Sequence, residues 1–382
     1  MALIVAKQRE VDSYYDSDRV NQSTLKELGK GFSSFLKYQR KQEEETGVSK
    51  PHFVVGSAVD TILTGEPGQF EEKYFISDFE FALSEVEIKM ITYVFDELVS
   101  NNVEVDLPFN EYMNMIANAA LEYDWYKGKP GPKRTEGFII KALPYFEMLK
   151  ESYGKEIISV SQNYVITKVT ESLKEHETTK NYFDVSLYIN NPNVDIYYQL
   201  PIYYTHEGVE CKALLDMMLV FRNPDTHKVE SIQPIDLKTM SGETIDFLKS
   251  VKQWRYDIQA AWYTVAVKHW MKAQNISLEG CVLKPFQFIV QSTTNLLSAP
   301  LIFEVSSELL HIGQHGRHAV TVGHLAEGVP KSHENIDICW EIKGFKSFLE
   351  EFIYYSNQGW VMDKRVAEND GVYMLDWDGL NL

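Results

Sequence analysis

Three consecutive stretches rich in β-forming residues constrain this fold more than any other feature of the sequence. They cover residues 196–205 (IYYQLPIYYT), 209–221 (VECKALLDMMLVF) and 229–238 (VESIQPIDLK). Asn223, Pro224 and Asp225 mark a turn between the last two. Stretches of this length and composition, bounded by turn residues, predict consecutive antiparallel strands. The second half of the chain should therefore contain a sheet.

Helical patterns surround these strands, because apolar residues recur three or four positions apart on both sides. The expected helices cover residues 23–44 (capped by Ser23), 57–63, 84–126, 164–176, 243–273 and a region reaching about 358, and two further strands are expected at 286–292 and 301–305. The predicted fold class is therefore α/β, with a central mixed sheet of about four or five strands flanked by helices. We expect a mainly helical region over 1–150, a core over 151–305 and a helical C-terminal region over 306–382.

Composition and cysteine content narrow the class of protein. The 382 residues are 44% hydrophobic and 24% charged, as in ordinary globular proteins. Three widely separated cysteines cannot build a disulfide framework or a four-cysteine metal cluster. The apolar N-terminal stretch is too short for a signal peptide, and no run approaches the roughly 20 apolar residues of a membrane span. We expect a soluble, cytoplasmic protein without membrane contact.

The net charge of -18 argues against nucleic-acid binding, since duplex affinity comes largely from Lys and Arg. A phosphate chain responds to the local field, however, so an acidic protein can still hold a basic channel. Residues 127–134 (KGKPGPKR) carry four cations and no acid, namely Lys127, Lys129, Lys133 and Arg134. Their prolines and glycines predict an irregular loop, either simply solvated or contacting DNA, with even odds.

Two aspartates and a lysine should converge on the predicted hairpin. Asp216 and Asp236 are symmetric about position 226, and residues symmetric about a hairpin turn lie opposite each other. Lys238 follows Asp236 by two residues, which places both on the same face of the strand. These three side chains form either a structural ion pair or a functional site, and spacing alone leaves both open.

A divalent cation would relieve the repulsion between two facing carboxylates on apolar strands. Carboxylate oxygens favour magnesium or manganese, and magnesium engages substrate phosphates. Such a metal activates water, while a nearby lysine orients that water or stabilises the transition state. The helix that follows adds Gln259 and Tyr263, four residues apart and so on one helix face. Both can point at a ligand, although a core tyrosine with a polar neighbour is the commoner arrangement.

The succession LLD (214–216), IDLKT (235–239) and YDIQAAWY (256–263) resembles the PD-(D/E)xK nuclease superfamily. It is most similar to the phage and prophage exonucleases of the exodeoxyribonuclease VIII (RecE-like) group, which are related to the RecB nuclease domain and lambda exonuclease. The similarity extends to residues 23–39, 56–76 and 154–176, and so covers roughly residues 20–300. The last 80 or so residues do not match.

The resemblance implies a restriction-endonuclease-like core and assigns roles to individual residues. It places metal ligands at Asp216, Asp236 and the backbone carbonyl of Leu237, and catalytic roles at Asp216, Asp236, Lys238, Gln259 and Tyr263. Two positions depart from the pattern. Asp60 stands where a histidine is usual, four residues after Gly56, and Gln199 stands where a glutamate is frequent. Asp60 is an oxygen ligand suited to magnesium, so it is a further expected metal ligand.

The resemblance also implies an activity and partners. It implies Mg²⁺-dependent hydrolysis of linear double-stranded DNA, with Mn²⁺ able to substitute, 5′ to 3′ polarity, and a part in phage-type DNA recombination. The expected partners are duplex DNA, a single-strand annealing recombinase and further copies of the chain in a ring-shaped trimer or tetramer. The setting would be a bacterial or phage-infected cytoplasm. The alternatives are an inactive DNA-binding scaffold of the same fold and a structure-specific endonuclease.

One further pattern is the histidine series His311, His315 and His318, whose spacing can ligate zinc when a further ligand exists. Gly313 and Gly316 should weaken a helix there, so a solvated or nucleic-acid-facing surface is the favoured interpretation. The chain contains no phosphate-binding GxxxxGK[ST] loop, which leaves ATP hydrolysis without support.

Overall fold

The computed structural model describes residues 3–44, 51–78, 83–101, 109–125, 132–183, 191, 193–322 and 337–360. The chain forms two compact units: unit 1 comprises Met1–Ser49, Leu63–Glu66 and Lys168–Leu382, and unit 2 comprises Lys50–Ile62 and Pro67–Thr167. The units alternate along the chain and do not follow the three consecutive regions 1–150, 151–305 and 306–382. The first helices of the chain therefore belong to the same unit as the sheet.

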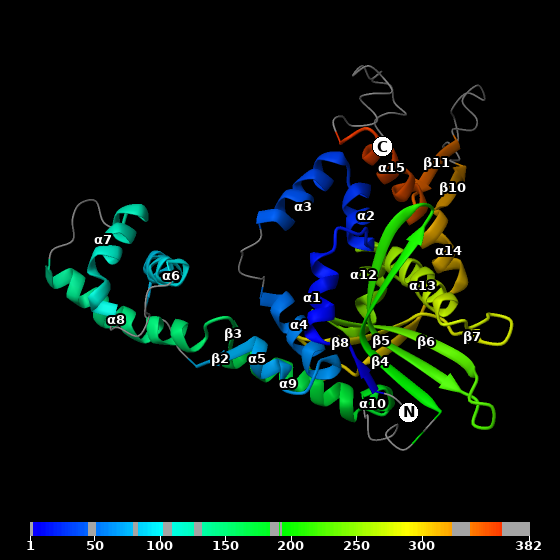
Figure 1. Cartoon of the computed structure of the whole chain (residues 1–382), viewed down its shortest axis with the longest axis horizontal. Coiled ribbons are helices and arrows are strands. Elements are labelled where there is room, and N and C mark those ends of the chain that lie inside the picture. The colour runs from blue at the N-terminus through cyan, green and yellow to red at the C-terminus, as the bar shows by residue number, and fades with distance from the viewer. Residues whose placement is uncertain are drawn as a thin grey trace, which may run out of the picture. The chain divides into compact units, whose positions relative to one another are not determined.

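Unit 1 contains a mixed seven-stranded sheet (Figure 1). Its strands occur in the order β1-β4-β5-β6-β8-β9, and β7 pairs with β6. Neighbours are antiparallel except for the parallel pairs β1–β4, β6–β7 and β6–β8. The strands are β1 Leu3–Val5, β4 Val194–His206, β5 Val209–Arg222, β6 Val229–Met240, β7 Val282–Leu283, β8 Gln287–Ser292 and β9 Leu301–Glu304.

The sheet confirms the predicted α/β class and the three consecutive antiparallel strands. The expected number of four or five strands was wrong, because the sheet has seven. The two additional strands, β1 and β7, have three and two residues. Strands this short carry too few residues for an alternating pattern to be recognised.

The helices of unit 1 come from both ends of the chain. They are α1 Gln8–Asp16, α2 Gln22–Gly29, α3 Phe32–Glu44, α10 Lys180–Phe183, α12 Phe247–Gln253, α13 Tyr256–Ala273, α14 Ser307–His315 and α15 Phe345–Asn357, with a short 3-10 helix at Thr244–Asp246. Two more helices, α4 (Pro51–Thr64) and α9 (Val160–Glu175), have residues in both units. Helix α13 packs against β4, β5 and β6.

The first predicted helix, 23–44, is divided into α2 and α3. Asn21 is the N-cap, since its side chain accepts a hydrogen bond from the amide of Thr24 at 2.9 Å, so the expected cap at Ser23 was wrong. The division falls at Gly31, whose φ of 125° is open to glycine and unfavourable for other residues. The apolar periodicity was still informative, because Leu25 and Phe35 are fully buried.

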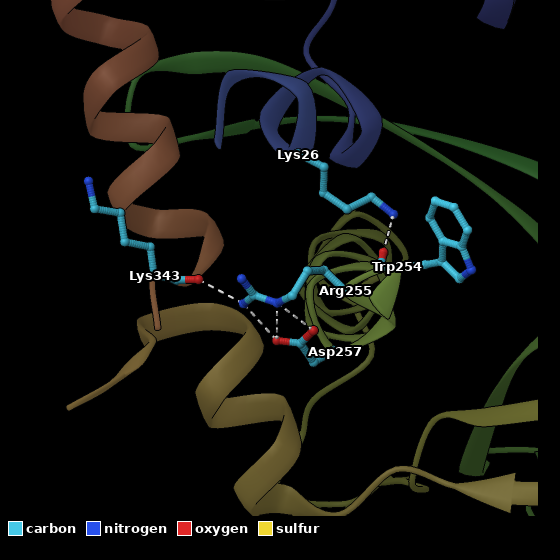
Figure 2. A network of polar contacts seen from close by, with 5 residues as sticks. All are labelled: Lys26, Trp254, Arg255, Asp257 and Lys343. Carbon is cyan, nitrogen blue, oxygen red and sulfur yellow. Dashed lines mark hydrogen bonds and ion pairs between the residues drawn. The ribbon is translucent and has the colours of Figure 1, made fainter. Parts of the chain in front are cut away.

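The long helix expected over 243–273 is also divided. Helix α12 ends at Gln253 and α13 begins at Tyr256. Between them Arg255 has φ 51° and ψ 52°, a left-handed conformation that is uncommon for a residue other than glycine. Arg255 is held there by three hydrogen bonds from its guanidinium to Asp257, at 3.0, 3.3 and 2.9 Å, and one to the carbonyl of Lys343 at 2.7 Å (Figure 2).

Helix α14 approaches α13 closely because it contains Gly313. The helix continues through this glycine to His315, so the expectation that Gly313 would weaken the helix was wrong. A Cβ atom at position 313 would overlap the backbone carbonyl of Asp257 and lie 3.0 Å from Cβ of Ala261. The absent side chain therefore allows the two helices to pack backbone against backbone.

Replacing Gly313 with alanine is expected to destabilise the protein by about 1–3 kcal/mol, because the two helices must separate to admit the methyl group. The measurement is the midpoint of urea unfolding. Gly137→Ala is the matched control, since Gly137 lies in a helix with nothing near its would-be Cβ. That change should leave stability unchanged or raise it by up to about 1 kcal/mol. Equal midpoints for the two variants would contradict the packing assigned to Gly313.

Unit 2 is mainly helical and has its own core. Helices α6, α7 and α8 bury an aromatic-rich cluster that includes Phe95, Phe109 and Phe146. Unit 2 also contains a short parallel pair of strands, β2 and β3. The elements are α5 Gln69–Lys73, β2 Tyr74–Ser77, α6 Glu85–Ser100, a 3-10 helix Phe109–Tyr112, α7 Met113–Glu122, α8 Pro132–Glu151 and β3 Glu156–Ser159.

The last three residues of the basic stretch 127–134 are helical. Lys127 and Lys129 lie outside the described residues, whereas Lys133 and Arg134 fall in the first turn of α8. The expectation that prolines and glycines exclude regular structure was therefore wrong from Pro132 onward. Proline suits the first position of a helix, since its fixed φ is helical and its missing amide would have no partner there.

The C-terminal region 306–382 was expected to be helical, but its described part also contains strands. Helices α14 and α15 flank an antiparallel pair formed by β10 (Arg317–Val322) and β11 (Asp337–Ile342). The helical expectation was wrong for these two six-residue segments. Across the described part of the chain, no helix combines the length and apolarity needed to cross a membrane.

Candidate active site

Asp216 and Asp236 occupy corresponding positions on β5 and β6. The ladder between these strands ends with the pair Met217↔Ile235, so the next position in the same register holds the two aspartates. A register shift at Phe221 and Arg222, near the turn, does not alter this correspondence. The symmetry seen in the sequence thus predicted the register correctly, because side-chain alternation and the turn together fix strand pairing.

Asp216 binds the backbone of the opposite strand. Its Oδ2 accepts a hydrogen bond from the amide of Leu237 at 2.8 Å. This contact lies just beyond the last backbone pair of the ladder and continues the connection between β5 and β6. The half-buried Asp216 carboxylate is therefore held beside Asp236 and Leu237, the residues that carry the other expected metal-binding oxygens.

Asp236 and Lys238 form a close ion pair on β6. Lys238 Nζ lies 2.6 Å from Asp236 Oδ2, and the two side chains are 21% and 2% exposed. Burial raises the pKa of the Asp236 carboxyl above its ordinary value, against the lowering effect of Lys238. Burial alone would lower the pKa of Lys238, but the carboxylates of Asp236 and Asp216 raise it above its ordinary value. The pair confirms that both side chains share one face of the strand.

Gln259 fixes the orientation of the Asp236 carboxylate. Its Nε2 donates to Asp236 Oδ1 at 2.6 Å, and Gln259 is itself only 5% exposed. Because Gln259 lies in the first turns of α13, the packing of this helix on the sheet determines where the amide points. The structure thus brings Gln259 to the aspartate as the sequence predicted.

Tyr263 lies one turn further along α13 and is 7% exposed. Its ring contacts Phe286, with centroids 6.1 Å apart. Burial raises the pKa of its hydroxyl well above the ordinary value, which keeps the hydroxyl protonated and able to donate a hydrogen bond. A catalytic role for Tyr263 stays a prediction.

Gln199 lies on β4 opposite Asp216. The pairs Tyr198↔Met217 and Leu200↔Leu215 bracket this position. Gln199 has a left-handed φ of 49°, and its Nε2 donates to Thr64 Oγ1 at 2.8 Å. Such a backbone conformation costs free energy and persists only when its surroundings impose it. In the sequence Gln199 stood out as a departure from the nuclease pattern, but nothing there indicated the backbone strain.

The remaining predicted site residues belong to unit 2. Asp60 is a half-buried residue of α4 in that unit, and its participation in the metal site stays a prediction. Lys133 and Arg134 are also in unit 2, at the start of α8, with side chains outside the described residues. Substrate binding by these two cations and by Lys127 and Lys129 likewise stays a prediction.

Lys26 was not predicted, yet it lies beside the candidate site. Its Nζ is 5.6 Å from the centre of the Tyr256 ring, and Lys238 Nζ is 5.3 Å from the centre of the same ring. Burial and the charge of Lys238 lower the pKa of Lys26 to about 8. In the sequence Lys26 is one of several lysines in a helical pattern, and nothing there distinguishes it from the others.

The histidine series forms a surface feature. His311 and His315 are exposed on α14 with ring centroids 4.6 Å apart, and the side chain of His318 lies outside the described residues. Within the described ranges, no cluster of three or more His, Cys, Asp or Glu side chains is arranged to hold a metal ion.

The two aspartates nevertheless suit a hard cation. They offer carboxylate oxygens from corresponding positions of adjacent strands, and Leu237, whose amide donates to Asp216, carries a backbone carbonyl as a further oxygen. Among the described residues, Asp236 Oδ2 is buried without an aligned hydrogen-bond donor, although the Lys238 ammonium forms its ion pair there. An oxygen in this condition has lone-pair capacity that a cation can use. The donor set fits magnesium or manganese better than a soft metal.

Comparison with known proteins yields little similarity. Neither protein-family profiles nor curated proteins match the chain. Among solved structures, a crystal structure of a protein from Eubacterium rectale described as a putative exonuclease aligns with 50% of this chain and 66% of that chain. The two are 17% identical, with a TM-score of 0.26. A likeness at this level supports no conclusion about activity, so the function has to be argued from the site itself.

Proposed function

We propose that this chain is a metal-dependent nuclease that hydrolyses phosphodiester bonds of DNA at Asp216, Asp236 and Lys238. One observation carries the proposal: two carboxylates from adjacent strands lie beside a lysine ammonium, and a buried glutamine holds one of them in place. A purely structural ion pair needs one acid and one base. The second acid and the orienting amide are what a phosphate-cleaving site requires in addition.

Some of the site residues would bind the metal, and others would stabilise charge or orient a ligand. Asp216, Asp236 and the Leu237 carbonyl would hold magnesium, which supplies an activated water and polarises the phosphoryl oxygen. Lys238 places a positive charge next to these oxygens, where it can stabilise the charge that develops on the phosphate. Gln259 keeps the Asp236 carboxylate in one orientation, and preorganisation of this kind lowers the cost of reaching the transition state.

The specific activity that we propose is exonucleolytic digestion of linear double-stranded DNA in phage-type recombination. Its support is the sequence resemblance of IDLKT and YDIQAAWY to exonucleases of the exodeoxyribonuclease VIII group. The same resemblance supports 5′ to 3′ polarity, a ring-shaped homo-oligomer, a single-strand annealing partner and a cytoplasmic location in a bacterial host. Asp60 is proposed as a further metal ligand on the same basis.

Purified protein should degrade linear duplex DNA in magnesium, leave covalently closed circles intact, and stop when EDTA is added. The measurement is gel electrophoresis of end-labelled linear DNA and supercoiled circles over time. Degradation of linear DNA alone supports an exonuclease, whereas nicking of circles would indicate an endonuclease instead. Absence of cleavage on both substrates, in magnesium and in manganese, would contradict the proposal and favour a DNA-binding scaffold.

A further inference from the structure

We propose that Lys26 binds a phosphate group of the DNA strand that occupies the candidate active site, next to Lys238. This inference rests on the proposed function, because it assigns a ligand group to the same site. It adds a residue from α2, more than 200 positions away in sequence from β6, to the substrate-binding surface. The ligand class is a phosphodiester of nucleic acid.

The position of Lys26 is defined by contacts with the loop between α12 and α13. Its Nζ donates to the carbonyl of Trp254 at 3.1 Å, and Figure 2 shows the side chain extending from α2 toward that carbonyl. The ring of Tyr256, two residues further on, lies within cation–π distance of both Lys26 and Lys238. Two ammonium groups from distant parts of the chain therefore converge on one tyrosine.

Lys26 retains unused hydrogen-bonding capacity. An ammonium group has three donors, and the Trp254 carbonyl takes one of them. No carboxylate of the described residues is within ion-pair distance of Lys26, whereas the neighbouring Lys30 is paired with Glu27 at 2.6 Å and Lys249 with Asp246 at 2.7 Å. Lys26 is thus a half-buried cation whose charge is not neutralised by direct contact.

The electrostatics of the site favour an anion at this place. Burial and the nearby Lys238 ammonium both disfavour the charged form of Lys26, so its pKa falls to about 8. A phosphate between or beside the two ammonium groups would replace this repulsion with attraction and stabilise both cations. The carboxylates of Asp236 and Asp257 act on Lys26 in the opposite direction, but burial and Lys238 outweigh them.

Lys26 could instead serve only to cap the C-terminal end of α12, since Trp254 is the C-cap residue of that helix. The two roles differ in what they predict. A cap contributes to stability and leaves the salt dependence of DNA binding unchanged. A phosphate contact contributes to that salt dependence, because each neutralised phosphate releases counterions.

The test compares DNA binding by wild type, Lys26→Gln and Lys30→Gln. Fluorescence anisotropy of a labelled duplex is measured in EDTA, where cleavage cannot proceed, over a series of salt concentrations. Lys26→Gln should reduce the slope of log K against log salt by about 0.9, the value for one phosphate contact. Lys30→Gln is the matched control, since Lys30 is an exposed, ion-paired lysine at the end of the same helix. Unchanged slope in Lys26→Gln, or an equal reduction in Lys30→Gln, overturns the inference.

A labelling experiment on the wild-type protein covers the case in which Lys26→Gln does not fold. An amine with a pKa near 8 reacts readily with an acylating reagent at that pH, and mass spectrometry reads the labelling of each lysine. Duplex DNA in EDTA should protect Lys26 and leave labelling of Lys30 unchanged. Equal labelling of Lys26 with and without DNA overturns the proposal.

These readouts separate the failure of the inference from the failure of the proposed function. Neither depends on cleavage. If Lys26→Gln reduces the salt dependence of binding, or DNA protects Lys26 from labelling, but the protein cleaves no DNA, the phosphate contact is supported and the nuclease proposal fails. If the protein cleaves DNA but neither measurement changes at Lys26, the nuclease proposal is supported and the phosphate contact fails. A protein that binds no duplex at any salt concentration would lose both.

Discussion

A Lys238→Met variant is expected to cleave duplex DNA roughly 10²–10³-fold more slowly than wild type, the usual cost of removing one preorganised charge-stabilising group. Methionine retains much of the length of the side chain and removes its charge. The loss has two physical sources. The phosphate loses a cationic partner, and the buried Asp236 carboxylate loses the ammonium that opposes its protonation. The measurement is the initial rate of digestion of linear DNA in magnesium.

Lys249→Met is the control for this variant, because Lys249 is a solvent-exposed lysine of α12 that forms its own ion pair with Asp246. Its digestion rate should equal that of wild type. Melting temperatures of both variants establish that the folded state persists. A Lys238→Met variant that digests DNA at the wild-type rate would remove Lys238 from the proposed mechanism.

An Asp236→Ala variant is expected to lose all stabilisation by divalent cations. A ligand that binds only the folded state adds about 2.7 kcal/mol to the free energy of unfolding at 100 times its dissociation constant. Wild type should therefore melt at a higher temperature in manganese than in EDTA. The variant should melt at the same temperature in both, because alanine removes one of the two carboxylates that β5 and β6 contribute to the proposed metal site.

The alanine variant will also be less stable without metal, since Lys238 is left as a largely buried cation without its partner. Each protein is therefore compared with itself in manganese and in EDTA. Asp236→Asn, which keeps the shape of the side chain, serves if the alanine variant does not fold. Asp246→Ala is the control and should keep the wild-type shift. An unchanged manganese shift in Asp236→Ala would show that the cation binds elsewhere.

The sheet and the register of its acids could be predicted from sequence because both depend on local rules. Alternation of side chains and a recognisable turn at 223–225 determine how β5 and β6 pair, and the pairing brings Asp216 and Asp236 to corresponding positions. The same alternation places Lys238 beside Asp236. No knowledge of distant residues is needed for any of these inferences.

Other features escaped prediction because distant residues determine them. The break between α12 and α13 depends on Arg255 in a left-handed conformation, which contacts with Asp257 and Lys343 sustain. Lys26 acquires its role only when α2 meets the loop at Trp254. A helical pattern reports which face of a helix is buried, but it does not report what that face meets.

The hydrogen bonds of Arg255 connect the C-terminal region of the chain to the loop beside the candidate site. One guanidinium group joins the first turn of α13 to the carbonyl of Lys343, one of the two residues between β11 and α15. The same loop presents Trp254 to Lys26 and Tyr256 to both lysines. The C-terminal region, which showed no resemblance to the nuclease family, thus stabilises the loop between α12 and α13. A truncation that removes Lys343 would loosen this loop without deleting any residue of the site.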